Sequence, residues 1–264
     1  NVSGLGRAFT SLGVASRLVH LLYRQTVARA AWVFFQNEDD RRLFIDRGYV
    51  QVGRTSRLPG SGVDLDAFAP TPLPSRQAGS GVFLMVARLL WDKGVREYVE
   101  AARALRVRWP QARFQVLGPL DASARSGVPR ATLEAWVADG LVEYLGETDN
   151  IRPFLQAADC VVLPSYYREG VPRSLLEAAA TMRPVITTDA VGCRDTVDPG
   201  ISGLLCRPRD AKDLAEKMAQ VLMMTPEQRA AMGGAGRQKM EQEFDERSVI
   251  DAYRLRVALL KRAP

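Results

Sequence analysis

Two carboxylates flank an expected helix start in the stretch SYYREGVPRSLLE, residues 165–177. Glu169 lies in the loop before Gly-Val-Pro, and Glu177 lies eight positions later, about one turn inside a helix that should begin at Pro172 or Arg173. The first amides of such a helix have no intrahelical partner and, with the helix dipole, favour an anion such as phosphate. Carboxylates beside a phosphate make sense if they accept hydrogen bonds from hydroxyl groups, as a nucleoside diphosphate sugar would offer. Taken alone, such a pair is more often a solvated loop residue and a helix-surface residue.

A second group of candidate residues follows two other expected strands. In VARLLWDKG, Arg88 ends one strand and Lys93 opens the next helix. Two cations at one strand end fit a diphosphate, the arginine as a planar fork and the lysine as a point charge. Gly118, in VLGP, ends a further strand where a ligand could approach the backbone. When each is taken alone, ordinary solvated charge explains Arg88 and Lys93 better, and Gly118 is a weak signal.

The elements that must position these residues alternate regularly after residue 81. Six apolar strands are expected, at 82–88, 112–118, 141–146, 159–164, 184–189 and in GISGLLCRP, residues 200–208. Helical patterns separate them, which indicates an α/β fold with a doubly wound parallel sheet covered on both faces. Ligands of such sheets bind at the carboxyl ends of the strands, where all the candidate residues are expected.

The chain before this region has a different organisation. A helix is expected over 13–30, a short strand over 31–36, and then a helix that Asn37 caps and Gly48 ends. The segment 70–81 concentrates Pro, Gly and Ser, and it is the expected boundary between two parts.

Composition and missing motifs exclude several classes of function. The net charge of +6 would attract phosphorylated substrates, anionic lipid or nucleic acid, but the basic residues are dispersed as on a solvated surface. The chain has no GxGxxG and no GxxxxGK[ST], which disfavours a dehydrogenase or a P-loop NTPase. Its three cysteines have no metal-ligand spacing and favour a reducing compartment. We therefore expect no bound metal, no separate cofactor and no nucleic-acid partner.

Together these groups resemble the retaining GT-B glycosyltransferases of family GT4, over about residues 31–250. EGVPRSLLE matches their E-x7-E motif, VARLLWDKG their R-x4-K element, and GSGVDLDAF the segment that leads into the linker. The resemblance implies a GT-B fold with a Rossmann-like donor domain. It also implies that Arg88 and Lys93 bind the diphosphate and help it depart, and that Glu169 contacts the donor sugar.

By the same resemblance, further residues bind the donor. Glu177 would hold the ribose, and Ser174 and Leu175 would offer amides to the phosphates. Gly170, Val171 and Pro172 would line the sugar pocket.

A narrower resemblance concerns the first residues, NVSGLGRAFTS. They are similar to a segment of bacterial GT4 enzymes that extend lipid-linked glycans for lipopolysaccharide, capsule or glycoprotein. This implies a cytoplasmic transferase of hexosyl or N-acetylhexosaminyl groups, with a UDP-sugar as donor and a lipid-linked or glycan acceptor, peripheral at the inner face of the membrane. We expect 1–78 to be the tail of an acceptor-side domain and its linker, 79–245 the nucleotide-sugar domain, and 246–264 a crossover helix.

Two other functions stay open at this point. One is a nucleotide-sugar epimerase of the same architecture, and the other is a binding module that lacks transferase activity. His20, the single histidine, lies on an amphipathic helical pattern and is expected to be structural. No residue is assigned as a catalytic base.

Overall fold

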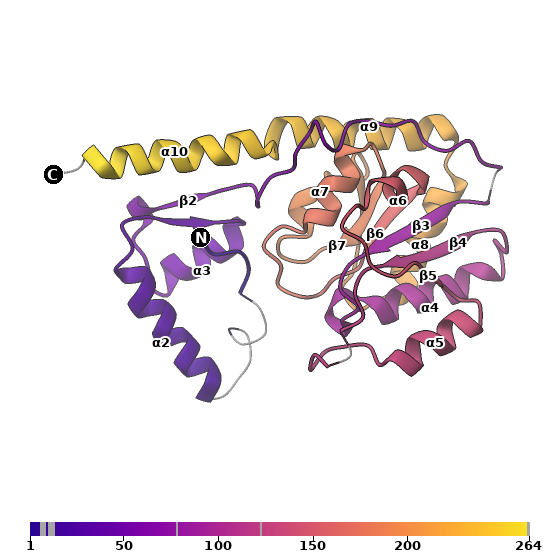
Figure 1. The fold of residues 1–264 in the computed structure, drawn as a ribbon, viewed down its shortest axis with the longest axis horizontal. Helices are drawn as coiled ribbons and strands as arrows, with labels where there is room; N and C mark the ends of the chain where they lie inside the picture. The colour runs from indigo at the N-terminus through magenta and orange to yellow at the C-terminus, as the bar shows by residue number, and fades with distance from the viewer. Residues whose placement is uncertain (6–8, 10–13, 78, 122, 263–264) are drawn as a thin grey trace.

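A six-stranded parallel sheet forms the centre of the larger part of the molecule, residues 63–245 (Figure 1). The computed structural model describes residues 1–5, 9, 14–77, 79–121 and 123–262. The strands are β3 (Val82–Val86), β4 (Arg113–Leu117), β5 (Glu143–Tyr144), β6 (Cys160–Leu163), β7 (Val185–Thr188) and β8 (Gly203–Cys206). All neighbouring strands are parallel, so the predicted sheet is confirmed.

The strand order is β5-β4-β3-β6-β7-β8, which is the order of a doubly wound dinucleotide-type fold. The chain winds outward from β3 in one direction and then from β6 in the other. A crevice therefore opens outside the carboxyl ends of β3 and β6, where such sheets bind their ligands.

Helices cover both faces of this sheet (Figure 1). On one side are α4 (Val95–Arg106), α5 (Arg130–Ala138) and α8 (Ala211–Met223), and on the other are α6 (Arg152–Ala157), α7 (Arg173–Ala180) and α9 (Pro226–Glu243). The four residues of β6 and the four of β7 are all buried. Burial on both faces is why β6 is apolar without alternation, and in β7 the buried Thr187 and Thr188 hydroxyls donate to the carbonyl oxygens of Leu163 and Ser165.

The N-terminal part, residues 1–58, has its own small core. It contains α2 (Val14–Ala28), β1 (Val33–Phe35), α3 (Glu38–Asp46) and β2 (Thr55–Arg57), with β1 and β2 paired in parallel. Phe35 and Phe44 are completely buried at its centre. The expected cap of α3 is confirmed, because the Asn37 side chain accepts a hydrogen bond from the Asp40 amide at 2.7 Å.

The chain crosses twice between the two parts, and the two crossings lie against each other. The Val63 amide donates to the Phe244 carbonyl at 2.8 Å, and the Glu246 amide donates to the Val63 carbonyl at 3.2 Å. A Cβ on Gly62 would lie 2.5 Å from the Glu246 Cα. Only glycine therefore allows this approach.

Two arginines of the larger part hold the segment that follows the first crossing. Arg183 is completely buried and donates to the carbonyl oxygens of Thr71 and Pro72. Arg237 donates to the carbonyl oxygens of Leu65 and Phe68. The proline-rich segment that the composition marks as a linker is thus fixed to the sheet domain by side-chain bonds to its backbone.

The last helix, α10 (Glu246–Arg262), continues beyond α9 and runs along the N-terminal part (Figure 1). Its Val249 is buried with Phe34 and Leu58, and Tyr253 packs beside them. Farther along, Leu255 is 63% exposed. Within the described residues, no helix is long and apolar enough to cross a membrane.

Candidate nucleotide-sugar site

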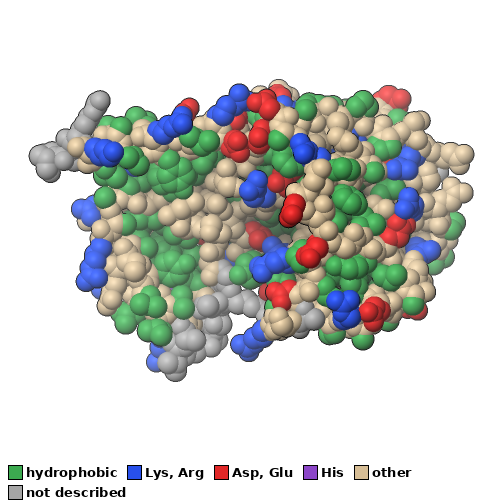
Figure 2. Space-filling view, viewed as in Figure 1, with side chains coloured by type: hydrophobic (Ala, Val, Ile, Leu, Met, Phe, Trp, Pro, Cys, Tyr) green, Lys and Arg blue, Asp and Glu red, His purple; other side chains and the backbone are tan. Residues whose placement is uncertain are grey.

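A cavity of about 390 Å³ lies at the carboxyl ends of β3, β4 and β6, where the strand order reverses. Its walls come from the ends of these strands, from the loop before α7 and from the N-terminal part. Most of the residues predicted from the sequence line it: Arg88, Lys93, Gly118, Glu169, Gly170, Val171, Pro172 and Ser174. Charged side chains of both signs gather on the face of the molecule where the two parts meet (Figure 2).

Arg88 and Lys93 enter the cavity from the segment after β3. The strand is shorter than expected: it ends at Val86, and Arg88 lies two residues beyond it. Lys93 does not open α4, because it ends a single 3-10 turn that Gly94 closes in a left-handed conformation (φ 79°). A Cβ on Gly94 would lie 2.1 Å from the Pro164 carbonyl oxygen, so contact with the end of β6 sets this turn.

Lys93 and Glu169 form an ion pair with each other inside the cavity. Lys93 Nζ lies 2.5 Å from Glu169 Oε1, and the Ser165 hydroxyl donates to the same oxygen at 2.8 Å. An ammonium group has three hydrogens, so Lys93 can hold Glu169 and still donate to a ligand. In the part of the chain that the structure describes, no hydrogen bond or ion pair engages the Arg88 guanidinium, which is exposed.

The start of α7 closes one end of the cavity. Pro172 is the cap residue and Arg173 is the first helical residue. Of the two expected starts, Pro172 and Arg173, the second is therefore confirmed. Ser174 lines the cavity, but Leu175 does not: its side chain is completely buried and its amide donates to the Pro172 carbonyl at 3.2 Å. The helix therefore offers fewer free amides to an anion than the sequence predicts.

Glu177 lies beside the cavity rather than in its lining. Its side chain is 12% exposed, and its Oε1 lies 3.5 Å from the Arg173 guanidinium, which does line the cavity. Burial raises the pKa of the Glu177 carboxyl above its ordinary value of 4.5, and Arg173 lowers it by a smaller amount. With Arg88 and Lys93, Arg173 gives the cavity three cations against the carboxylate of Glu169, a balance that suits a diphosphate.

Gly118 provides the close backbone approach expected of it. It has a φ of 140°, and a Cβ there would lie 2.1 Å from the Ala87 carbonyl oxygen. The end of β4 therefore packs directly on the segment that carries Arg88.

Several lining residues were not found from the sequence. Thr148 and Ile151 follow β5, so the rule that ligands lie at strand ends could have identified them. Ser3 and Gln36 come from the N-terminal part, and nothing local in their sequence places them beside the sheet.

His20 is not part of the cavity lining. Its ring packs on Phe9, with 4.2 Å between the ring centroids, and its Nδ1 lies 3.0 Å from the Tyr49 hydroxyl.

A second cavity, of about 450 Å³, lies beyond the Glu169 loop and is lined by Tyr167, Arg168 and other residues. Among the residues described, no group of three or more His, Cys, Asp or Glu side chains could hold a metal ion.

Comparison with known proteins identifies relatives of this arrangement. A family model described as "Glycosyl transferases group 1" matches residues 80–224, which is more than half of the chain. The N,N'-diacetylbacillosaminyl-diphospho-undecaprenol alpha-1,3-N-acetylgalactosaminyltransferase of Campylobacter jejuni is 31% identical over 235 residues. The putative colanic acid biosynthesis glycosyltransferase WcaL of Escherichia coli is 29% identical over 195 residues.

These matches cover 84% and 71% of this chain but only 60% and 47% of the two relatives. The chain therefore spans roughly half the length of the curated proteins that it matches.

Solved structures share the fold. The sucrose-phosphate synthase from Thermosynechococcus elongatus superposes with a TM-score of 0.79 at 24% identity, over 97% of this chain and 65% of that one. Anabaena Alr3699/HepE in complex with UDP superposes with a TM-score of 0.76 at 19% identity, over 91% of this chain and 67% of that one.

Proposed function

This chain belongs to the group 1 glycosyltransferases, family GT4, with the GT-B fold, and from that premise we propose that it transfers a sugar from a nucleoside diphosphate sugar with retention of configuration. The observation that carries the proposal is the cavity at the switch point of the sheet, which brings Arg88, Lys93, Ser174 and Glu169 together. Cations and an acid converge there on a space at the carboxyl ends of the strands, where a diphosphate and a sugar fit side by side.

Each residue has a role that its position supports. Arg88 and Lys93 stabilise the negative charge that develops on the departing diphosphate, because both cations line the cavity. The ion pair with Glu169 holds Lys93 in place before the reaction begins. Glu169 accepts hydrogen bonds from the donor sugar, with Gly170 and Val171 beside it, and Glu177 accepts hydrogen bonds from the ribose.

UDP is the proposed nucleotide, and the acceptor is a lipid-linked or polysaccharide glycan. A structure with the same fold contains UDP, and the Campylobacter relative is by its name an N-acetylgalactosaminyltransferase that acts on a diphospho-undecaprenol substrate. A cytoplasmic enzyme at the inner face of the membrane would meet both substrates, and its net charge of +6 favours an anionic surface. The acceptor-side role of residues 1–78 belongs to the same proposal.

Thermal unfolding with a panel of nucleotides tests the donor site. UDP, GDP, ADP and four UDP-sugars (glucose, galactose and their N-acetylamino forms) are added at equal concentrations. A ligand present at 100 times its Kd stabilises the folded state by about 2.7 kcal/mol, so UDP and one UDP-sugar should raise the Tm by several degrees.

Two variants and a matched control locate the effect. Arg88→Ala and Lys93→Ala should each abolish most of the UDP-dependent shift, whereas Arg103→Ala, an exposed arginine at the far end of α4, should leave it unchanged. A panel in which no diphosphate raises the Tm of the unmodified chain would overturn the proposal.

A further inference from the structure

The loop that carries Glu169 is held from the N-terminal part by the start of α3. Asp40 Oδ1 lies 2.6 Å from Arg168 Nε, and the Asp40 side chain has no exposed surface. The Asn37 side-chain amide, also without exposed surface, donates to the carbonyl oxygens of Glu169 (3.3 Å) and Gly170 (3.4 Å). These bonds join residues about 130 positions apart in the chain.

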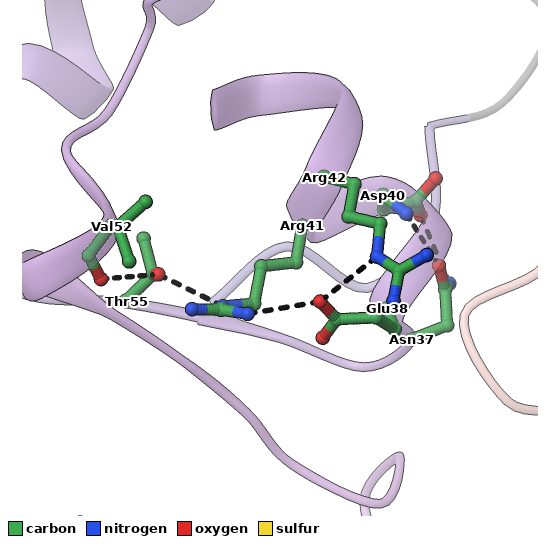
Figure 3. Close-up of polar contacts among 7 residues, drawn as sticks. All are labelled: Asn37, Glu38, Asp40, Arg41, Arg42, Val52 and Thr55. Atoms are coloured by element: carbon green, nitrogen blue, oxygen red, sulfur yellow. Dashed lines mark hydrogen bonds and ion pairs between the residues drawn. The ribbon is translucent and has the colours of Figure 1, made fainter. Parts of the chain in front are cut away.

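Asn37 has two separate tasks in this arrangement. Its Oδ1 accepts from the Asp40 amide and so caps α3, while its Nδ2 donates to Asp40 Oδ2 at 3.1 Å and to the loop. Figure 3 shows Asn37 and Asp40 turned towards each other, whereas Arg41 turns away towards Glu38 and Thr55. One side of the helix start therefore faces the Glu169 loop, and the other serves the N-terminal part alone.

The contact between the loop and the N-terminal part leaves no room for a side chain at Gly170 or Gly4. A Cβ on Gly170 would lie 1.9 Å from Gln36 Oε1 and 2.7 Å from the Ser3 carbonyl oxygen. A Cβ on Gly4 would lie 2.8 Å from the Gly170 amide nitrogen. The loop thus lies directly against two segments of the N-terminal part.

Glu169 is consequently fixed from both sides. Lys93 and Ser165, from the larger part, hold its carboxylate, and Asn37, from the N-terminal part, holds its carbonyl. Asn37 and Asp40 do not line the nucleotide-sugar cavity. Their bonds to the loop connect them to a ligand there.

We propose that Asn37, Asp40 and Arg168 are positioning residues that set Glu169 for the sugar of the donor, so that the N-terminal part affects sugar affinity more than diphosphate affinity. The inference rests on the proposed function. Among the described residues, no hydrogen bond or ion pair joins these three side chains to Arg88 or Lys93, and Lys93 meets the loop through the Glu169 carboxylate. The affinity for the sugar should therefore depend on the three residues more strongly than the affinity for the diphosphate.

An Asn37→Ser variant separates capping from positioning. Serine caps a helix about as well as asparagine, so α3 keeps its N-terminal bond, but serine has no amide to reach the carbonyls of Glu169 and Gly170. Calorimetry gives the Kd of UDP and of whichever UDP-sugar binds best in the thermal panel. We expect the UDP Kd to change less than twofold, and the ratio of UDP affinity to UDP-sugar affinity to shift by about five- to tenfold against the sugar.

A second variant removes the ion pair without leaving a lone buried charge. Asp40→Asn combined with Arg168→Gln makes both side chains neutral and polar and should shift the same ratio in the same direction. Arg41→Gln is the matched control, because Arg41 lies on the same turn of α3 and, among the described residues, its side chain bonds to Glu38 and Thr55 and not to the Glu169 loop. Circular dichroism and thermal unfolding verify that each variant is folded.

The outcomes separate this inference from the proposed function. An unmodified chain that binds no nucleotide, or that gains nothing from the sugar, refutes the donor site and the positioning role together. If the unmodified chain binds normally, an unchanged ratio in both variants, or an equal loss of UDP and UDP-sugar affinity, overturns the positioning role alone.

Discussion

Glu177 is placed where burial opposes its charge. Its pKa is raised above 4.5 by burial, so the folded state binds a proton more readily than the unfolded state does. The contribution of the Glu177 carboxyl to the free energy of unfolding is therefore complete at low pH, where the group is protonated. It is lost as the pH rises from 4.5 through the raised pKa. Such a residue is more easily explained by a ligand that bonds to its carboxylate than by the stability of the fold.

Glu177→Gln tests this reading by a comparison of Tm values across pH. In the absence of nucleotide the variant should be more stable than the parent chain at pH 7 to 8, and the difference should vanish below pH 4.5, where both side chains are neutral. The same variant should bind a UDP-sugar more weakly, by about 1.5–3 kcal/mol if the carboxylate holds the ribose diol. A variant that is less stable at every pH would contradict the direction of the pKa shift.

Gly118 is predicted to tolerate no side chain. Gly118→Ala would place a Cβ 2.1 Å from the Ala87 carbonyl oxygen, at a φ of 140°. We expect it to lower the free energy of unfolding in urea by about 1–3 kcal/mol or more. Gly53→Ala is the matched control, because nothing lies within 4 Å of the Cβ it would gain. Equal stability of the two variants would show that the segment after β3 can move aside.

The sequence predicts the individual site residues that lie at the end of a strand, and it misses those that reach the cavity through contacts distant in the chain. Arg88, Lys93 and Gly118 were found because each follows an apolar strand. Gln36 reaches the same cavity only because the N-terminal part packs against the loop before α7, a contact between residues more than 100 positions apart. The local sequence pattern does not predict such a contact.

The elements themselves follow closely from local sequence, and their ends show where tertiary contact decides. Helix α9 begins with a capping box in which Thr225 Oγ1 accepts from the Gln228 amide and the Gln228 side chain accepts from the Thr225 amide. By contrast, β3 ends at Val86 and α4 begins at Val95, both inside the expected bounds. The intervening turn is closed by Gly94 against Pro164, and no local signal gives that contact.

Thr225→Ala should destabilise the chain by about 1 kcal/mol in urea unfolding, because it removes one partner of the Gln228 amide at the start of α9. Thr225→Ser keeps the hydroxyl and should be within a few tenths of a kcal/mol of the parent chain. If both variants lose the same stability, the methyl group rather than the cap is responsible.

For the whole molecule, the fold class was correctly predicted, and the sheet order agrees with it. The alternating pattern predicts a doubly wound sheet because strands buried on both faces must be apolar throughout. The division into 1–78, 79–245 and 246–264 stays a prediction. The structure shows the small core of the N-terminal part and the larger core of the sheet, with Val63 and Leu65 already in the latter.

Helix α10 buries apolar side chains in its first half, whereas in its second half the Arg256 guanidinium lies over the Trp32 ring, 3.3 Å from its centroid. This predicts unequal effects of apolar substitutions along the helix. Val249→Ala removes buried surface against Phe34 and Leu58 and should cost about 1.5 kcal/mol in urea unfolding. Leu255→Ala removes a side chain that is 63% exposed and should cost less than about 0.5 kcal/mol. A larger loss at Leu255 would mean that the second half of α10 is covered in solution.

The paired crossings at Val63 and Glu246 restrict how the molecule can open. Because the two connecting segments are hydrogen-bonded to each other, they join the two parts at one place and not as two independent connections. Since α10 packs on the N-terminal part through Val249, it must turn together with that part, while α9 stays with the sheet. Any movement that widens the nucleotide-sugar cavity between the two parts must also separate Asn37 and Asp40 from the Glu169 loop.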